Sequence, residues 1–448
     1  MFISSNKTDI CHRRYGDFIV LYDVCRRTII RLDDVAADIW EYISLKDKVT
    51  INDITEYIAS LYECDQGDIL PDIESFIDEL YYFSAVSKND KSYCGNCDQG
   101  IDNDDNYEEV ILKEMEELNQ IYSATLELTY DCNEQCVHCY ATFPNSGEHR
   151  QIALAKYQEI INELKDMGCL HLTFTGGDPF VNKDFPEIFK YAREKGFVCD
   201  IFTNGLALYD NPELMIEIVN QKPRAFYISL YGASADVHDE ITRVKGSFQK
   251  TITVARDLIS RGVPVVFNVM ILVGNYDDLD SIIDLCTNIG AEYRISMSVI
   301  NRNDGSDDPM KYFLSDKEKI KCVLAKVSEN YYSMDKPLER ADRGTFMCGA
   351  GITSLTISPE GQVFPCVSLK DSLGDVFSMS LKDCWDGQKR KDVREALRWE
   401  KSNICNECNL FDYCTHCPGI SQSESGIISD CNTCDKILAQ CSFEIENL

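Results

Sequence analysis

The fold is decided by residues 123–140, SATLELTYDCNEQCVHCY, in which a β-prone run leads directly into three cysteines. Cys132, Cys136 and Cys139 are spaced Cys-x3-Cys-x2-Cys. A cubane iron–sulfur cluster held by protein alone normally takes four thiolates. Three thiols in one loop leave one iron without a protein donor, and that iron can bind and activate a small molecule. The other interpretation is a zinc loop, although zinc loops mostly use pairs of cysteines two residues apart.

Composition narrows the class of protein. A chain of 448 residues should hold two or three domains. Met1 to Asp9 contain no apolar signal region and no apolar run reaches membrane-spanning length, so we expect a cytoplasmic protein without a membrane partner. Its 22 cysteines then indicate metal rather than disulfides. A net charge of −31 argues against nucleic acid as a partner; it would suit a basic partner or serve only solubility.

Residues 1–86 form a predicted separate unit. Two β-prone runs, 18–23 and 28–32, precede three amphipathic helical patterns that carry Val35 to Ile43, Ile54 to Leu61 and Ile69 to Leu80. The pattern is similar to the peptide-recognition domain of the PQQ-chaperone type, in which a leader peptide adds a strand to the sheet edge. A winged-helix cap without a ligand is the alternative.

An acidic linker is predicted at 87–120, ending in a short helix. Cys94 and Cys97 lie in it, either as incidental thiols or as a redox or zinc half-site.

Residues 121–310 predict an open barrel of alternating strands and helices. Candidate strands begin near Ser123, Leu170, Phe197, Ala225, Val265 and Glu292, with helices such as Ser247 to Arg261 between them. Six such repeats imply a partial (βα)6 barrel of the α/β class. Because the chemistry of βα barrels gathers at the carboxyl ends of the strands, we expect the cysteine loop and the glycine-containing turns after the next three strands to meet there.

The cysteine spacing and these loops resemble the radical S-adenosylmethionine (SAM) enzymes, in which SAM chelates the open iron and yields a 5′-deoxyadenosyl radical. The resemblance implies that Cys132, Cys136 and Cys139 are the catalytic metal ligands. Asp178 stands where the family usually has Glu, and Tyr231 where it usually has Asp. The residues that the resemblance assigns to SAM binding are His138, Gly176, Gly177, Asp178, Asn204, Ser229, Arg243 and Asn268.

A second field of cysteines occupies residues 345–448. Read by spacing alone, its paired cysteines would suit a zinc ribbon. Their order resembles the SPASM extension of radical SAM enzymes, which binds two auxiliary clusters, for three 4Fe–4S clusters in all. The last internal gap is two residues here and typically three in the family. By resemblance, the first auxiliary cluster takes Cys348, Cys366 and Cys417 and the second takes Cys405, Cys408, Cys414 and Cys431, with Cys434 as an alternative to Cys431.

This architecture resembles the radical SAM/SPASM maturases of ribosomally made peptides, especially the thioether-forming sactipeptide and ranthipeptide types. The resemblance implies two partners: a precursor peptide with an N-terminal leader, and an electron donor such as flavodoxin or ferredoxin. Carbon–carbon crosslinking and epimerisation are the nearest alternatives, with Cys434 or Cys441 as a hydrogen donor in the latter. A sulfatase-maturing enzyme would lack the N-terminal unit. A zinc-stapled peptide-binding scaffold is the non-enzymatic alternative.

Overall fold

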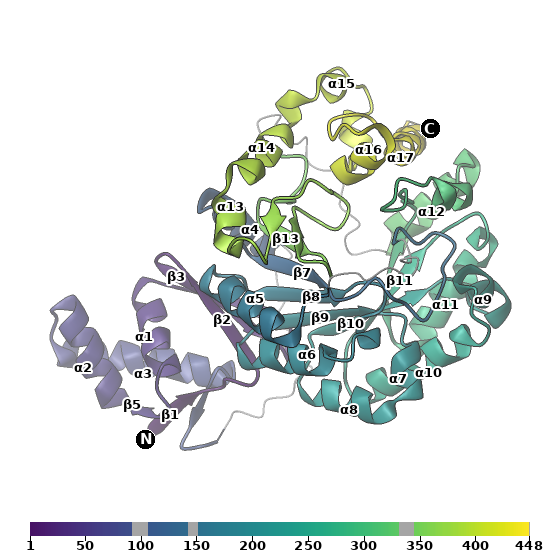
Figure 1. Ribbon diagram of the computed structural model, residues 1–448. Coiled ribbons are helices and arrows are strands. Elements are labelled where there is room, and N and C mark those ends of the chain that lie inside the picture. Colours follow the sequence, from purple (N-terminus) through teal and green to yellow (C-terminus); the bar gives the residue numbers. More distant parts are fainter. Residues whose placement is uncertain (92–105, 142–150, 331–344, 448) are drawn as a thin grey trace.

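The structure is a computed structural model that describes residues 1–91, 106–141, 151–330 and 345–447 (Figure 1). Cys94 and Cys97 lie outside the described residues. The chain forms an N-terminal sheet with three helices, a central half-barrel and a C-terminal part above the barrel (Figure 1). This is the predicted mixed α/β architecture.

The N-terminal region is built on a three-stranded antiparallel sheet in the order β2-β3-β4. The predicted runs 18–23 and 28–32 are its second and third strands; the first strand and a small second sheet, β5-β1-β6, were not predicted. All three predicted helices are present. The elements are β1 (Phe2–Ser5), β2 (Ile10–Tyr15), β3 (Phe18–Asp23), β4 (Thr28–Asp33), α1 (Asp34–Ser44), β5 (Val49–Thr50), α2 (Ile51–Tyr62), α3 (Gln66–Tyr82), β6 (Val86–Lys88) and α4 (Asn106–Glu117).

The central region has the six predicted parallel strands in sequential order, from β7 to β12. Both faces of β9 and β10 are almost wholly buried, as expected of a parallel sheet between helices. The elements are β7 (Ser123–Glu127), α5 (Leu154–Asp166), β8 (His171–Thr175), α6 (Phe185–Glu194), β9 (Val198–Thr203), α7 (Leu206–Asp210), α8 (Pro212–Asn220), β10 (Ala225–Leu230), α9 (Ala235–Thr242), α10 (Ser247–Ser260), β11 (Val265–Met270), α11 (Leu279–Ile289), β12 (Glu292–Ser296) and α12 (Lys317–Asn330).

The C-terminal region continues the barrel sheet instead of forming a sheet of its own. Strand β13 pairs in parallel with β7, from Ser354 opposite Ser123 to Ile357 opposite Leu126, so the full order is β12-β11-β10-β9-β8-β7-β13-β14-β15. The predicted boundary at residue 345 therefore separates the cysteine loop of the barrel from the C-terminal cysteines, but the strands on its two sides belong to one sheet. The elements are β13 (Ser354–Ile357), β14 (Gln362–Phe364), β15 (Gly374–Asp375), α13 (Leu381–Asp386), α14 (Gln388–Ala396), α15 (Asn403–Asn406), α16 (Pro418–Ser425) and α17 (Thr433–Glu446).

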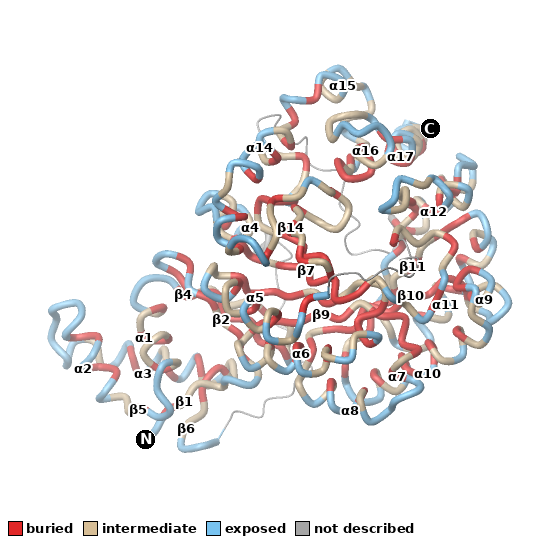
Figure 2. Tube along the Cα trace, in the orientation of Figure 1, coloured by how far each residue is buried: buried red, intermediate tan, exposed pale blue. Residues whose placement is uncertain are grey.

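The main core lies between the barrel strands and their outer helices, where buried residues concentrate (Figure 2). Aromatic side chains provide much of its volume. Phe174 on β8 packs 5.5 Å from Phe185 and 5.6 Å from Phe189 on α6, measured between ring centres. Each fully buried side chain of this size contributes about 1.5–3 kcal/mol relative to an exposed one. This rigid layer fixes the strands that carry the site.

The N-terminal sheet docks on the amino ends of the barrel strands, through side chains of β2. The Arg13 guanidinium donates to the carbonyls of Cys169 (2.8 Å) and Gly196 (3.1 Å) and stacks 4.5 Å from the centre of the Phe197 ring. The Tyr15 hydroxyl donates to the Gly168 carbonyl at 2.8 Å. These groups directly precede β8 and β9, so the N-terminal region lies at the end of the barrel opposite the loops that follow the strands.

Candidate active site

The four predicted loops meet at the carboxyl ends of β7 to β10. The cysteine loop follows β7, and residues 176–178 follow β8. Asn204 follows β9, and its side-chain amide donates to Asn133 Oδ1 at 2.6 Å and to Cys132 Sγ at 3.6 Å. Tyr231 follows β10 and packs against His138 of the cysteine loop, 4.7 Å between ring centres. The expected convergence is therefore present.

Gly176 and Gly177 allow β8 to continue along the start of the cysteine loop. The Gly177 N–H donates to the Thr129 carbonyl at 2.6 Å. A Cβ on Gly176 would lie 2.2 Å from the Thr129 carbonyl oxygen, and one on Gly177 would lie 2.1 Å from that of Asp131. Gly176 also has a φ of +140°, which side chains rarely adopt. Both glycines are thus required to position the cysteine loop.

The Asp178 carboxylate joins β8 to β9. It is fully buried and accepts from the Phe180 N–H (3.0 Å), the Thr203 hydroxyl (2.7 Å) and the Asn204 N–H (2.9 Å). Burial raises the pKa of Asp178, and these three hydrogen bonds oppose the shift. The resemblance implied that the backbone and the carboxylate of residues 176–178 together contact the methionine ammonium of SAM. In this structure the carboxylate also has a structural role, because its three protein donors tie β8 to β9.

The three cysteines of the loop are partly buried. Cys132 Sγ accepts from the Glu134 N–H at 3.4 Å, and Cys136 donates to the Glu134 carboxylate at 3.3 Å. Burial raises the pKa of Cys132 to about 12 and that of Cys136 well above its ordinary value, and the negative charges of Glu134 and Cys139 add to both shifts. Burial raises the pKa of Cys139 as well. Only bound metal would hold three such thiols as thiolates, because a cation favours the deprotonated ligand.

Buried polar atoms without partners surround this loop. Glu134 Oε1, His138 Nδ1 and Arg302 Nε have no hydrogen-bond partner in the described part of the chain. Such orphans are rare in folded proteins and indicate a missing polar ligand. Burial lowers the pKa of His138 to about 4, so its ring is neutral at pH 7. The donor set therefore fits a thiolate-bound cluster with a polar cofactor beside it.

The remaining predicted SAM residues are placed unequally. Ser229 on β10 and Asn268 on β11 are paired across the two strands, which puts them side by side. Arg243 ends α9 at a φ of +59° and is exposed, and its guanidinium donates to the Tyr312 hydroxyl at 3.3 Å. The sequence reasoning missed Arg302, which lies in the loop after β12. No spacing rule points to that residue, whereas Glu134 could have been noticed as an acid between two cysteine ligands.

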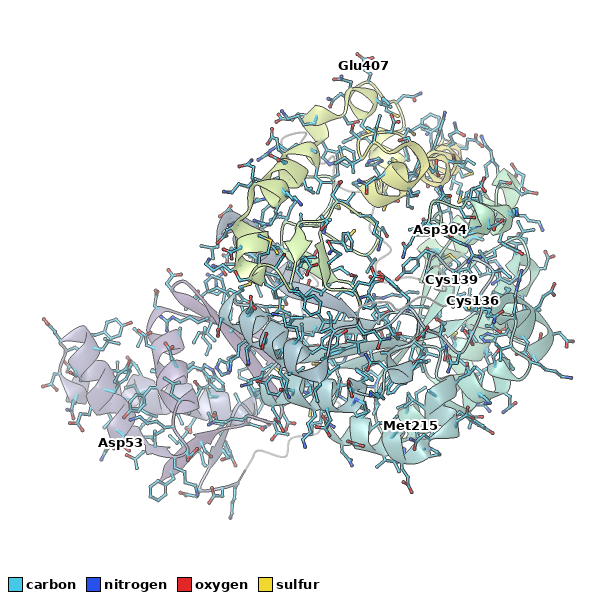
Figure 3. All side chains as sticks on the ribbon, in the orientation of Figure 1. Asp53, Cys136, Cys139, Met215, Asp304 and Glu407 are labelled. Carbon is cyan, nitrogen blue, oxygen red and sulfur yellow. The ribbon has the colours of Figure 1, made fainter. Side chains whose placement is uncertain are left out.

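The loop after β12 reaches the cysteine loop directly. The Asn303 N–H donates to the Tyr140 carbonyl at 2.8 Å, and the positive charge of Arg302 lowers the pKa of Cys139 against the effect of burial. Figure 3 labels Cys136, Cys139 and Asp304, which belong to these two loops.

Several of the C-terminal cysteines lie near enough to one another for their charges to interact. Charge on Cys366 and on Cys417 raises the pKa of Cys348, after the larger effect of burial. In the second set, Cys414 is influenced in the same way by Cys405, Cys431 and Cys408. Within the described residues, no group of three or more His, Cys, Asp or Glu side chains is close enough to hold a single metal ion. The thiols of each set are therefore spaced more widely than the ligands of a single metal ion would be.

Cys434 is separate from the second set. It is fully buried, and its thiol donates to the Val299 carbonyl at 3.4 Å. Beyond burial, its pKa is raised by the charges of Glu424, Asp435 and Cys417, whereas charge on Cys405 and Cys408 raises the pKa of Cys431. The geometry therefore favours Cys431 over Cys434 in the second set. Cys441 is a fully buried thiol on α17.

Three protein-family models match the chain in the order of these regions. The first, Coenzyme PQQ synthesis protein D, matches residues 19–81. The radical SAM superfamily matches residues 126–286, and the iron–sulfur cluster-binding SPASM domain matches residues 348–409. Residues 126–286, which hold the cysteine loop, thus match the radical SAM superfamily. The resemblance to radical SAM/SPASM peptide maturases with a PqqD-like domain is confirmed, and SAM and iron–sulfur clusters are the cofactors of this architecture.

Relatives of this radical SAM protein include two curated enzymes. The mycofactocin maturase MftC of Mycolicibacterium smegmatis is 28% identical over 303 residues, which cover 65% of this chain and 76% of MftC. The AdoMet-dependent heme synthase of Methanosarcina barkeri is 24% identical over 316 residues, covering 65% of this chain and 89% of the synthase.

Among solved structures, Streptococcus suis SuiB bound to its precursor peptide SuiA shares the fold. It has a TM-score of 0.63 and 15% sequence identity, and the similarity covers 97% of this chain and 99% of SuiB. None of the helices in the described ranges is both long and apolar enough to cross a membrane.

Proposed function

We propose that this radical SAM protein is a maturase that forms intramolecular thioether bonds, from a cysteine sulfur to a carbon, in a ribosomally made peptide. The observation that carries the proposal is the loop of Cys132, Cys136 and Cys139, with orphaned polar atoms around it, at the mouth of a half-barrel whose sheet continues into the SPASM hairpin. SAM bound at such a loop supplies a 5′-deoxyadenosyl radical. The relatives MftC and SuiB, a maturase and a protein bound to a precursor peptide, support a peptide substrate.

Each region would have its own task. Residues 1–86 would bind the leader peptide, and residues 87–120 would connect them to the barrel of residues 121–310. Residues 345–448 would hold two auxiliary clusters, for three clusters in all. An electron donor such as flavodoxin or ferredoxin would supply the electron for radical formation.

The leader peptide would add to strand β4. Both β2 and β4 are edges of the N-terminal sheet, since β3 lies between them. Arg13 and Tyr15 fasten β2 to the barrel, and Arg193 donates to the Thr8 carbonyl just before β2. Among the described residues, strand β4 pairs only with β3, so its outer edge is the better template for a peptide strand.

A thioether product is supported by the first auxiliary set. This set has three cysteines, Cys348, Cys366 and Cys417, and the preceding cysteine in the sequence, Cys322, is exposed on α12. A cubane normally takes four thiolates. A substrate cysteine could complete the set, which would bring its sulfur to the site. Forming the C–S bond replaces one C–H and one S–H bond, so the peptide loses two hydrogen atoms. The C–H hydrogen would pass to the 5′-deoxyadenosyl radical, the thiol would release its proton to solvent, and an auxiliary cluster would accept the remaining electron.

The test has two stages. First, the protein is reconstituted with iron and sulfide without oxygen, reduced, and assayed for 5′-deoxyadenosine from SAM. We expect product from the wild type and none from the triple variant Cys132→Ala, Cys136→Ala, Cys139→Ala. A triple variant of the exposed thiols Cys25, Cys64 and Cys322 is the matched control and should behave as wild type.

In the second stage, short cysteine-containing peptides encoded beside this gene are added, and their masses and linkages are measured. Loss of two hydrogens per bond, with a thioether in fragmentation spectra, supports the proposal. An unchanged mass with an inverted residue would indicate an epimerase, and a carbon–carbon link would contradict thioether formation. Absence of iron uptake by the wild type would refute the radical mechanism altogether.

A further inference from the structure

A partly buried lysine, whose ammonium nitrogen is shielded from water, lies between the cysteine loop of the barrel and the first proposed auxiliary cysteine set. Lys370 lies in the loop between β14 and β15, four residues after Cys366. Its ammonium lies 5.9 Å from the centre of the Tyr140 ring, which follows Cys139, and 5.2 Å from that of Phe364. The ring of Tyr140 thus belongs to the cysteine loop of the barrel, and the ring of Phe364 belongs to the C-terminal region that carries Cys366.

This ammonium has no partner of its own. Lys370 Nζ is buried and makes no hydrogen bond within the described part of the chain. Lysine is almost never buried unless it is paired, because removing an ammonium from water is costly. Two aromatic rings near 5–6 Å supply only a modest compensating attraction. A missing anion explains the arrangement better than packing does.

The nearest buried carboxylate is already engaged. Glu127, the last residue of β7, is fully buried and accepts from the hydroxyls of Tyr140 (2.8 Å) and Tyr130 (3.4 Å). Lys370 lowers the pKa of this carboxyl, and burial raises it more strongly. Glu127 thus attracts the ammonium from a distance without forming an ion pair, and no acceptor among the described residues takes the three N–H donors of Lys370.

The lysine is held in place by its own loop. Its backbone N–H donates to Gln422 Oε1 on α16 at 2.9 Å, and the Leu369 N–H donates to Cys366 Sγ at 3.2 Å. Gly419 on α16 approaches the same loop so closely that a Cβ there would lie 2.6 Å from the Ser368 side chain. These contacts fix the ammonium relative to Cys366 and Cys417.

We propose that Lys370 is the anion-binding residue of the active site, and that its ammonium holds the deprotonated thiol of the peptide cysteine beside Cys366. This inference rests on the proposed function. A free cysteine has a pKa near 8.5, and a neighbouring ammonium favours its thiolate, the nucleophilic form. Lys370 is therefore a substrate-positioning group for the acceptor sulfur and takes no part in SAM cleavage.

The experiment compares wild type with Lys370→Met and Lys370→Arg, using Lys389→Met on the exposed side of α14 as the matched control. With a precursor that the wild type crosslinks, we expect Lys370→Met to form 5′-deoxyadenosine within about twofold of wild type. The ratio of crosslinked peptide to 5′-deoxyadenosine should fall about 10- to 100-fold, as for loss of a charged hydrogen bond. Lys370→Arg should recover part of the ratio, and Lys389→Met should match wild type.

A binding measurement separates this inference from the proposed function. N-acetyl-L-cysteinamide is titrated into each reconstituted protein, and the electron paramagnetic resonance and visible spectra of the clusters are followed. We expect saturable spectral changes in wild type and at least tenfold weaker binding in Lys370→Met, with no change from N-acetyl-L-serinamide. Equal thiol binding and equal coupling in Lys370→Met would overturn the inference. If the wild type crosslinks no candidate precursor, the proposed function fails, whereas the thiol titration still decides the role of Lys370.

Discussion

Replacing Asp178 with alanine tests whether this carboxylate is the internal bridge between β8 and β9. In wild type it accepts from the Phe180 N–H, the Thr203 hydroxyl and the Asn204 N–H. The hydroxyl can turn to another acceptor, but the two backbone N–H groups cannot. Each would be left buried without a partner, at a cost of about 1–3 kcal/mol. Since alanine also removes the cost of burying a carboxylate, we expect a net loss of about 3 kcal/mol.

The assay is thermal unfolding followed by near-ultraviolet circular dichroism, together with iron content after reconstitution. In a domain of the barrel's size, about 3 kcal/mol corresponds to a decrease in Tm of about 6–12 °C. Iron content should also fall, because Asn204, which follows the broken contact, donates to Cys132. Asp178→Asn keeps the shape and one acceptor oxygen, so it should lose about 1 kcal/mol.

Asp184→Ala is the matched control. Asp184 precedes α6, and its side chain makes no capping hydrogen bond, so its removal should change stability by less than about 0.5 kcal/mol. The reasoning would be refuted if Asp178→Ala unfolded within 2 °C of the Asp184→Ala control and bound as much iron.

Three further predictions follow from buried contacts. Gly177→Ala would push its Cβ onto the Asp131 carbonyl and should abolish iron loading by the cysteine loop, whereas Gly274→Ala, with nothing within 4 Å, should load normally. His238 is fully buried, and burial lowers its pKa to about 4, so the folded state takes up its proton less readily than the unfolded state, whose value is about 6.5. Above pH 6.5 the neutral ring does not oppose folding, so the free energy of unfolding is unaffected by this group. As the pH falls from 6.5 towards 4, the unfolded state takes up the proton first and the free energy of unfolding decreases. Urea unfolding at pH 7.5 and pH 5 should therefore show about 2 kcal/mol less pH dependence in His238→Asn, and an equal dependence would contradict the shift. Arg13→Met should increase hydrogen exchange in β2 to β4 by breaking the contacts with the barrel, and its exposed neighbour Arg14→Met should leave exchange unchanged.

Much of the fold could be predicted because its signals are local. The six parallel strands, the helices between them and the three N-terminal helices follow from hydrophobic periodicity over short windows. The cysteine spacings can also be recognised in a single sequence, because thiols that are a few residues apart in one loop or hairpin can bind the same cluster. Residues 132–139 and 405–414 are such cases. The family matches include residues 132–139 and, in the second region, Cys405 and Cys408.

Strand pairing across distant parts of the chain could not be predicted in this way. The parallel pairing of β13 with β7 joins residues more than 200 positions apart, and nothing in either short run specifies its partner. The same holds for Arg13, whose position on an edge strand gives no hint that it binds carbonyls beside β8 and β9.

The sequence by itself determined the class of cofactor, because metal ligation requires particular side chains at particular spacings. It also determined the sites that need glycine. The tertiary structure decided which polar groups face one another once water is excluded. It placed the Asp178 carboxylate between two strands and gathered Arg302 at the cysteine loop. It left the Lys370 ammonium buried between Tyr140 and Phe364. Burial and the choice of partner are properties of the packed chain, since both depend on residues far apart in sequence.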